Sequence, residues 1–209
     1  VLELLAMGEE SGIGIKQLIL PEIEKESRQD QLGELLEAVW DVTPVGYLSA
    51  GDGWSGGGTE FTCLHPPEEF PGKEPNAYSE CILVEFGKEK SGSGKENGWS
   101  LLLTGDVEGK GEEALLGELS AREIGRVTVL KVAHHGSRNS TAEELLEQIS
   151  PLLAVISCGR DNSYGHPHPE LLKRLSDSGA HVVQTSLTGA VTVSFRDGGL
   201  EVVCCGEGR

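Results

Sequence analysis

Three predominantly apolar segments, separated by segments with helical periodicity, constrain the fold of this chain more than any other feature. They are WSLLLTG (99–105), VTVLKVA (127–133) and LLAVISCG (152–159). Strands that are apolar at nearly every position are typical of sheets covered on both faces. Because such strands alternate here with helices, the sequence predicts a layered α/β protein with at least one helix-covered sheet.

The other elements follow from periodicity and from helix and turn signals. Helices are predicted at residues 1–10, 28–39 and about 108–120, with two more beginning near Ser140–Thr141, as a hydroxyl cap, and at Pro169. Segment 80–86 is predicted to form a hairpin with 99–105 around a flexible loop at about 88–98. The remaining predicted strands lie within 15–21, 45–54, 60–66, 181–186, 190–195 and 200–205.

Charge excludes one function class for the chain as a whole. Its 209 residues carry 17 Lys and Arg against 34 Asp and Glu, a formal net charge of -17. Binding of nucleic acid by blanket electrostatics needs a basic surface, so that mode is excluded. The excess is uneven, because residues 1–120 have a net charge of -16 and residues 121–209 a net charge of -1. An anionic substrate is therefore expected to meet the second part.

Histidines gather where chemistry is expected. Four of the six lie in two short clusters, His134 with His135 and His166 with His168, and each cluster follows a predicted buried strand. Asp106 follows a third such strand. In α/β sheets, ligands bind beyond the carboxyl ends of the strands. A carboxylate and imidazoles meeting there suit Zn²⁺, or Mn²⁺ with more oxygen ligands, and a metal-bound water would become a nucleophile at neutral pH.

Each signal has a structural alternative when it is taken alone. An Asp after a strand is commonly a turn or helix-cap residue, and the two prolines of GHPHP (165–169) could make a rigid turn. His65 is open between packing at a strand end and a role in the site, whereas His181 is interpreted as structural. The five cysteines form no Cys-x-x-Cys pair and are interpreted as small apolar fillers. Three clusters at three strand ends favour a functional site.

The order and spacing of these motifs resemble one protein family. LLLTGDVEG (101–109), VLKVAHHGSRNST (129–141) and ISCGRDNSYGHPHPELLKRL (156–175) resemble the C-terminal metallo-β-lactamase-fold domain of the ComEC competence, or DNA-uptake, proteins. LHPPEEF (64–70) and NAYSECILVEF (76–86) resemble the segment ahead of these motifs. The resemblance implies a four-layer αββα metallo-β-lactamase sandwich, with residues 1–209 as one partial domain.

The resemblance also implies site residues and cofactors. Asp106 matches the aspartate that bridges two divalent metal ions, Zn or Mn, and His134 is the first choice for a further ligand, with His135 as the second candidate. His135, His166 and His168 are the catalytic candidates; the last two could contact a phosphate or donate a proton to a leaving group. Hydrogen bonds from Ser137 and Arg138 could bind an anionic substrate.

One departure from the family pattern shapes the expected function. The fold's principal signature, His-x-His-x-Asp-His or its variant with Asp at the second His, is absent, since no His precedes His65. We therefore expect an N-terminally truncated domain that binds one metal ion or none, is inactive by itself, and dimerises to cover exposed apolar surface and strand edges.

Three functions are compatible with this interpretation. The first is a metal-dependent phosphodiesterase or nuclease in DNA uptake, acting as an extracytoplasmic soluble domain of a bacterial membrane protein, with DNA and the channel part of the same protein as partners. The second is a non-catalytic module that binds DNA or a partner of the uptake machinery. The third is a small-molecule esterase or lactonase of the same fold, because a fold does not fix a substrate.

Overall fold

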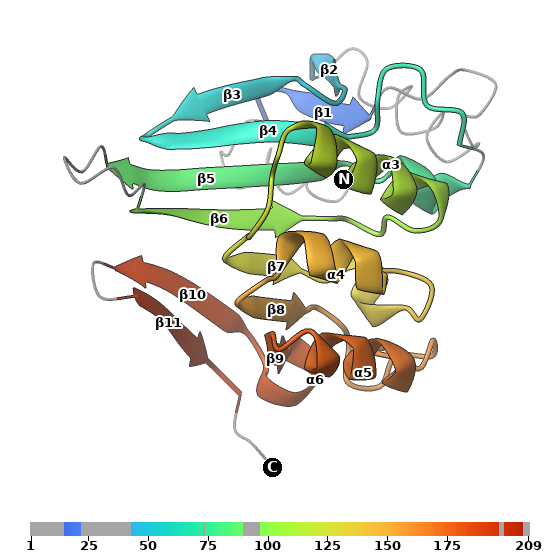
Figure 1. The fold of residues 1–209 in the computed structure, drawn as a ribbon, viewed down its shortest axis with the longest axis vertical. Coiled ribbons are helices and arrows are strands. Elements are labelled where there is room, and N and C mark those ends of the chain that lie inside the picture. Colours follow the sequence, from blue (N-terminus) through green and yellow to red (C-terminus); the bar gives the residue numbers. More distant parts are fainter. Residues whose placement is uncertain (1–14, 22–42, 73, 90–96, 197–198, 207–209) are drawn as a thin grey trace.

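The computed structural model describes residues 15–21, 43–72, 74–89, 97–196 and 199–206, and its centre is one mixed sheet (Figure 1). The strand order in this sheet is β3-β4-β5-β6-β7-β8-β9. Its strands are β3 (Gly53–Gly56), β4 (Thr59–His65), β5 (Cys81–Glu89), β6 (Asn97–Leu103), β7 (Val129–Lys131), β8 (Leu153–Ile156) and β9 (His181–Gln184). Two smaller sheets pair β1 (Leu18–Pro21) with β2 (Val45–Leu48) and β10 (Val191–Arg196) with β11 (Gly199–Cys204).

The direction of the strands changes within the large sheet. Strands β3 to β6 pair antiparallel, and the predicted hairpin between β5 and β6 is present with Ile82 opposite Leu103. Strands β6 to β9 pair parallel, so that the carboxyl ends of β6, β7 and β8 meet at one edge. Strand β5 extends to Glu89 and β6 begins at Asn97, so the ends of the predicted loop at 88–98 belong to strands, and residues 90–96 lie outside the described residues.

Helices cover one face of the sheet. Helices α3 (Lys110–Ala121), α4 (Glu143–Ile149) and α5 (Pro169–Asp177) lie side by side over that face (Figure 1). Short helical turns η2 (Pro75–Tyr78), η3 (Ala133–Gly136) and α6 (Thr185–Thr188) complete the helical elements of the described chain. The core between sheet and helices consists of fully buried aliphatic side chains, among them Leu102, Leu115, Leu130, Leu146 and Leu171.

The hairpin of β10 and β11 packs against part of the opposite face of the sheet. Side chains alternate along a strand, and Leu83 of β5 packs into the helix-side core, so Phe86 of the same strand points to the other face. There the Phe195 ring of β10 lies 4.7 Å from the Phe86 ring and 5.3 Å from the Trp99 ring of β6, measured between centroids. This cover is partial, since Leu103 of β6, which points to the same face as Phe86, is 38% exposed.

Some of the predicted helices and one predicted helix cap are not found as predicted in the described residues. The helices predicted at 1–10 and 28–39 lie outside the described residues. The prediction that Ser140 or Thr141 caps α4 is wrong, because the residue at the N-cap is Ala142 and its side chain makes no capping bond. The two hydroxyls bind the backbone of Ala133 instead. No helix in the described part of the chain is long and apolar enough to cross a membrane.

Candidate active site

The polar clusters that follow β6, β7 and β8 lie together at the edge where these strands end. Asp106 follows β6, His134 and His135 lie in the turn after β7, and His166 and His168 lie in the loop after β8. The His135 Nε2 atom is 3.5 Å from Asp106 Oδ1. The ring centroids of His134 and His166 are 5.5 Å apart, and those of His166 and His168 are 4.8 Å apart. The structure thus brings the five predicted residues into one group.

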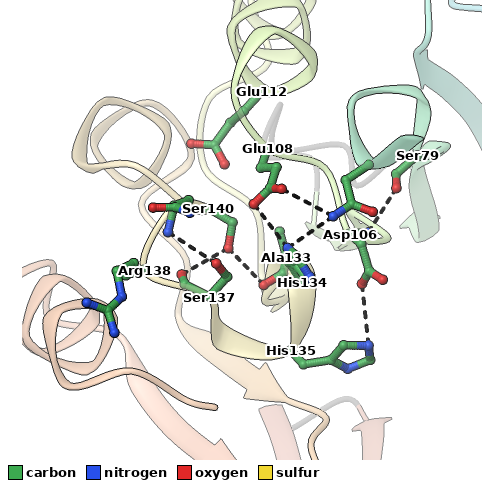
Figure 2. Close-up of polar contacts among 12 residues, drawn as sticks. Ser79, Asp106, Glu108, Glu112, Ala133, His134, His135, Ser137, Arg138 and Ser140 are labelled. Atoms are coloured by element: carbon green, nitrogen blue, oxygen red, sulfur yellow. Dashed lines mark hydrogen bonds and ion pairs between the residues drawn. The ribbon is translucent and has the colours of Figure 1, made fainter. Parts of the chain in front are cut away.

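Asp106 and His135 face each other, as Figure 2 shows. The His135 Nδ1 atom is 2.6 Å from the Ser157 carbonyl oxygen, which can only accept a hydrogen bond, so Nδ1 carries the proton. The lone pair of Nε2 is then directed toward Asp106. A metal-binding histidine typically donates its other ring N–H to a carbonyl or carboxylate in this way. The Asp106 backbone N–H donates to Ser79 Oγ at 3.1 Å, which fixes the start of the loop.

His134 has a different partner, the Glu108 carboxylate. Its Nδ1 atom is 3.0 Å from Glu108 Oε2, as Figure 2 shows. Asn76 Nδ2 donates to Glu108 Oε1 at 3.2 Å. Asn76 Nδ2 is also 3.4 Å from His134 Nδ1. Because the carboxylate only accepts, we assign the Nδ1 proton to His134 and the Asn76 hydrogen bond to Glu108. This arrangement leaves His134 Nε2 as a proton acceptor.

Lys131 brings a cation close to Asp106. Its Nζ atom donates to the Gly105 carbonyl at 2.6 Å and lies 3.8 Å from Asp106 Oδ1. Burial lowers the pKa of Lys131, whereas the neighbouring Asp106 opposes this change. Asp106 therefore lies between an ammonium group and an imidazole.

The backbone of the two adjacent histidines is unusual. His134 and His135 have φ angles of 45° and 53°, in the left-handed region that side chains disfavour. The next residue, Gly136, has φ of 92°, and a Cβ atom there would lie 2.6 Å from Pro167 Cβ. Only glycine fits at this position, so Gly136 allows the loops after β7 and β8 to approach each other.

The side chain of Asn162 holds the loop that carries His166 and His168. It donates to the carbonyl oxygens of Gly159 and His166 at 2.8 and 2.7 Å, and it accepts from the His166 N–H at 2.9 Å. Burial lowers the pKa of His166, and the neighbouring imidazoles, His168 first, lower it further. His168 Nδ1 accepts a hydrogen bond from the Arg138 backbone N–H at 3.1 Å, so a neutral His168 carries its proton on Nε2.

The two predicted substrate-binding side chains are placed differently from the histidines. Ser137 is buried, and its Oγ accepts from the Asn139 N–H at 3.2 Å. The Arg138 guanidinium is half-exposed, lies 3.4 Å from Glu170 Oε1, and points away from Asp106 (Figure 2). Their predicted role in binding an anion stays a prediction.

His65 lies outside this group. It is fully buried, its Nε2–H donates to the Ala77 carbonyl at 2.6 Å, and its ring packs edge-on against Phe70. Burial lowers the pKa of His65. These contacts favour packing at the strand end over a role in the site.

Several polar residues around the site were not predicted from the sequence. Glu108, two residues after Asp106, carried a signal, because both lie in the same turn after a strand. Nothing in the sequence pattern pointed to the others, Asn76, Ser79 and Asn162, since their partners lie on other elements. Lys131 lies in the predicted buried strand within 127–133, which gave no sign that its ammonium group would lie beside Asp106.

The residues of the site fit part of a metal centre. Asp106 and His135 offer one oxygen and one nitrogen donor to the same space, a set that suits Zn²⁺ or Mn²⁺. Among the described residues, no group of three or more His, Cys, Asp or Glu side chains could hold a metal ion.

Comparison of folds defines the class of protein. The chain is similar to CmlA, a diiron beta-hydroxylase from Streptomyces venezuelae, with a TM-score of 0.51 and 14% sequence identity, over 80% of this chain and 38% of that chain. This likeness concerns the fold alone. The large sheet under three helices is accordingly a metallo-β-lactamase-type α/β fold, and the predicted fold class is confirmed.

Comparison of sequences shows which proteins the chain is similar to. The chain is 37% identical over 156 residues to Recombination protein 2 of Haemophilus influenzae, 33% identical over 138 residues to ComE operon protein 3 of Bacillus subtilis, and 33% identical over 148 residues to Competence protein ComA of Neisseria gonorrhoeae. The matches cover 75%, 66% and 71% of this chain but only 18%, 16% and 20% of these relatives. No protein-family model matches. The chain is related to the ComEC competence proteins, as its motifs predicted.

Proposed function

We propose that this domain is a metal-dependent phosphodiesterase that cleaves DNA during uptake. The observation that carries the proposal is the Asp106–His135 pair, with Oδ1 and Nε2 3.5 Å apart, at the carboxyl edge of a metallo-β-lactamase-type sheet. The relationship to competence proteins supports DNA as the substrate. In this proposal the domain lies outside the cytoplasm, and the membrane part of the same protein is a further partner.

Asp106 and His135 would hold a divalent cation, Zn²⁺ or Mn²⁺. His135 is preferred over His134, the first choice from the resemblance, because its Nε2 atom lies 3.5 Å from Asp106 Oδ1. When bound, such an ion neutralises charge on a phosphodiester and makes a water molecule more acidic. Two ions would bind in the complete family pattern.

The other side chains would move protons around the phosphodiester. His134, whose Nδ1–H is fixed by Glu108, would accept a proton from the attacking water at Nε2. His168, whose Nδ1 accepts the Arg138 N–H, would donate its Nε2 proton to the leaving oxygen. Arg138 would bind a phosphate after leaving Glu170, a change that costs little because this ion pair is exposed.

The test is Mn²⁺-dependent cleavage of a fluorescent oligonucleotide, assayed with this chain and with a full-length competence protein. Asp106→Asn and His135→Gln are expected to lower Mn²⁺ affinity and cleavage by a factor of about 100 or more, because each removes a ligand. His134→Gln is expected to lower cleavage while Mn²⁺ still binds. Asp177→Asn on α5 is the matched control, since its carboxylate contacts Lys173 and not the site.

Each outcome separates the candidates. Unchanged cleavage by Asp106→Asn contradicts the proposal. If neither protein binds Mn²⁺ or cleaves DNA, the alternative of a non-catalytic DNA- or partner-binding module is favoured. Hydrolysis of ester substrates without DNA cleavage would favour an esterase or lactonase. The comparison of the two proteins also tests the prediction that this chain alone is inactive.

A further inference from the structure

The loop between β7 and α4 is held in a strained conformation. It carries His134 and His135. It ends at Thr141, the residue before Ala142, which is the N-cap of α4. The φ angle of Thr141 is 54°, and the two histidines also have positive φ. A β-branched residue with positive φ is a backbone outlier, and such residues persist only where surrounding contacts enforce them.

Two hydroxyls connect the end of this loop to its beginning. The Ala133 N–H donates to Thr141 Oγ1 at 3.3 Å, and Ser140 Oγ donates to the Ala133 carbonyl at 3.0 Å (Figure 2 shows the second contact). The backbone N–H and the carbonyl of Ala133, the residue before His134, are thus both bound, by Thr141 and Ser140 respectively. The position of this pair therefore determines where the His134–His135 peptide begins.

A buried carboxylate fixes the same pair from α3. Glu112 Oε2 accepts the Thr141 N–H at 2.5 Å, and Oε1 accepts the Ala142 N–H at 2.6 Å. The side chain is 7% exposed, and burial raises its pKa while the two backbone N–H groups and Arg174 oppose the change. A carboxylate with both oxygens occupied is a rigid attachment point.

A guanidinium fixes the loop from the other side. Arg174 of α5 donates to the carbonyl oxygens of Arg138 at 3.0 Å, Ser140 at 2.8 Å and Thr141 at 3.2 Å. All three acceptors precede α4, so Arg174 does not serve as a cap of that helix. The Thr141 residue is consequently bound at its N–H by Glu112 and at its carbonyl by Arg174.

We propose that Glu112 and Arg174 are positioning residues of the active site. They clamp Ser140 and Thr141, and through the two hydroxyls they fix Ala133, so that His134 and His135 keep their left-handed backbone and face Glu108 and Asp106. Neither residue is proposed to touch substrate. The purpose of this clamp rests on the proposed function, but its effect on the imidazoles can be measured without metal or DNA.

The test is the nitrogen NMR spectrum of the imidazoles in the metal-free chain. In the wild type, His134 and His135 are expected to show Nδ1–H tautomers, as their contacts with Glu108 and Ser157 require. Glu112→Gln keeps the volume and one acceptor but replaces the other with an amide NH₂. This variant is expected to broaden or shift both sets of signals and to lower Zn²⁺ affinity about 10-fold, as loss of outer-shell support does.

Matched variants separate positioning from general stability. Glu113→Gln, the neighbouring residue on α3, and Lys173→Gln, the neighbour of Arg174, should leave the imidazole signals unchanged. Arg174→Gln should shift them as Glu112→Gln does, and Arg174→Lys should restore part of the wild-type spectrum. Thermal unfolding confirms that each variant is folded.

The result that overturns the proposal is a folded Glu112→Gln variant with wild-type imidazole signals. If Glu112→Gln does not fold, the same criterion applies to Arg174→Gln, whose side chain is only partly buried. Failure of the proposed function is a separate result, because a wild-type chain that binds no metal could still show the expected tautomers and their loss in the variants.

Discussion

At the scale of single residues, the site depends on two neighbouring histidines that have different partners. The left-handed φ angles of His134 and His135 turn the two rings toward different carboxylates, Glu108 and Asp106. In extended backbone, successive side chains would also diverge, but they would point to opposite faces of a strand. Here both imidazoles stay at the same sheet edge, as the proposed roles of His135 in holding a cation and of His134 in accepting a proton require.

His65 provides a prediction about pH and stability. Burial lowers its pKa below the ordinary value of 6.5, so below that pH the unfolded chain binds a proton that the folded chain resists. The free energy of unfolding should therefore fall as the pH decreases from 6.5. His65→Gln should remove this contribution, so that the stability difference between wild type and variant narrows between pH 7.5 and 5 in urea denaturation.

The difference in unfolding free energy between wild type and His65→Gln cancels the effects of the other titrating groups. Burial raises the pKa values of Glu80 and Glu112, and each of these groups contributes stability that is lost as the pH rises, the opposite sign to His65. His181→Gln, at the exposed start of β9, is the control and should show no such narrowing. A constant difference between wild type and His65→Gln would contradict the prediction.

The chemical identity of the site residues could be predicted from sequence, but their pairing could not. Asp106 and the four clustered histidines were predictable, because polar residues directly after buried parallel strands must meet at one edge. The choice between His134 and His135 depends on backbone angles that no periodicity reveals. Glu112, in the first turn of α3, resembles any acidic residue at the start of a helix until packing brings α3 against the loop before α4.

At the scale of elements, the packing of the β10–β11 hairpin against the second face of the large sheet can be tested by mutation. Phe195→Ala removes the ring that packs against Phe86 and Trp99. It should lower the free energy of unfolding by roughly 2 kcal/mol, from lost apolar burial and aromatic contact. Guanidinium denaturation measures this change, and Phe195→Leu should retain most of the stability. Equal stability of Phe195→Ala and wild type would mean that the hairpin unfolds separately from the sheet.

The elements that could be predicted well are those whose own residues carry a start, turn or apolar-pattern signal. Helix α5 begins at the predicted Pro169, and the β5–β6 hairpin follows from two apolar runs around a Gly- and Ser-rich segment. The sequence predicted one strand within 45–54, whereas the structure has β2 and a separate β3 at Gly53–Gly56, whose residues are all exposed. Strand β3 exists because its backbone pairs with β4, a contact that periodicity does not record.

At the scale of the whole molecule, the chain matches only one part of each of its longer relatives. It spans about a fifth or less of the length of the competence proteins that it matches. Its negative charge lies almost entirely in the first part of the sequence, since residues 1–120 have a net charge of -16. Residues 121–209, which carry the four clustered histidines, have a net charge of -1. A polyanionic substrate is therefore expected to meet residues 121–209 rather than the acidic first part of the chain.

This division predicts weak, cation-dependent binding of DNA with a shallow salt dependence. If Arg138 and one other basic group contact two phosphates of a single strand, log Kobs should fall with log[NaCl] with a slope of about -1.4, since each contact contributes about -0.7. Fluorescence anisotropy of a labelled single strand, between 50 and 200 mM NaCl at fixed Mn²⁺, measures the slope. Arg138→Gln should reduce the magnitude of the slope by about 0.7, whereas Arg196→Gln, on β10, should not change it. Binding that persists without a divalent cation, or a slope of about -6 or steeper, would show that a broad basic surface holds the DNA, which a net charge of -17 argues against.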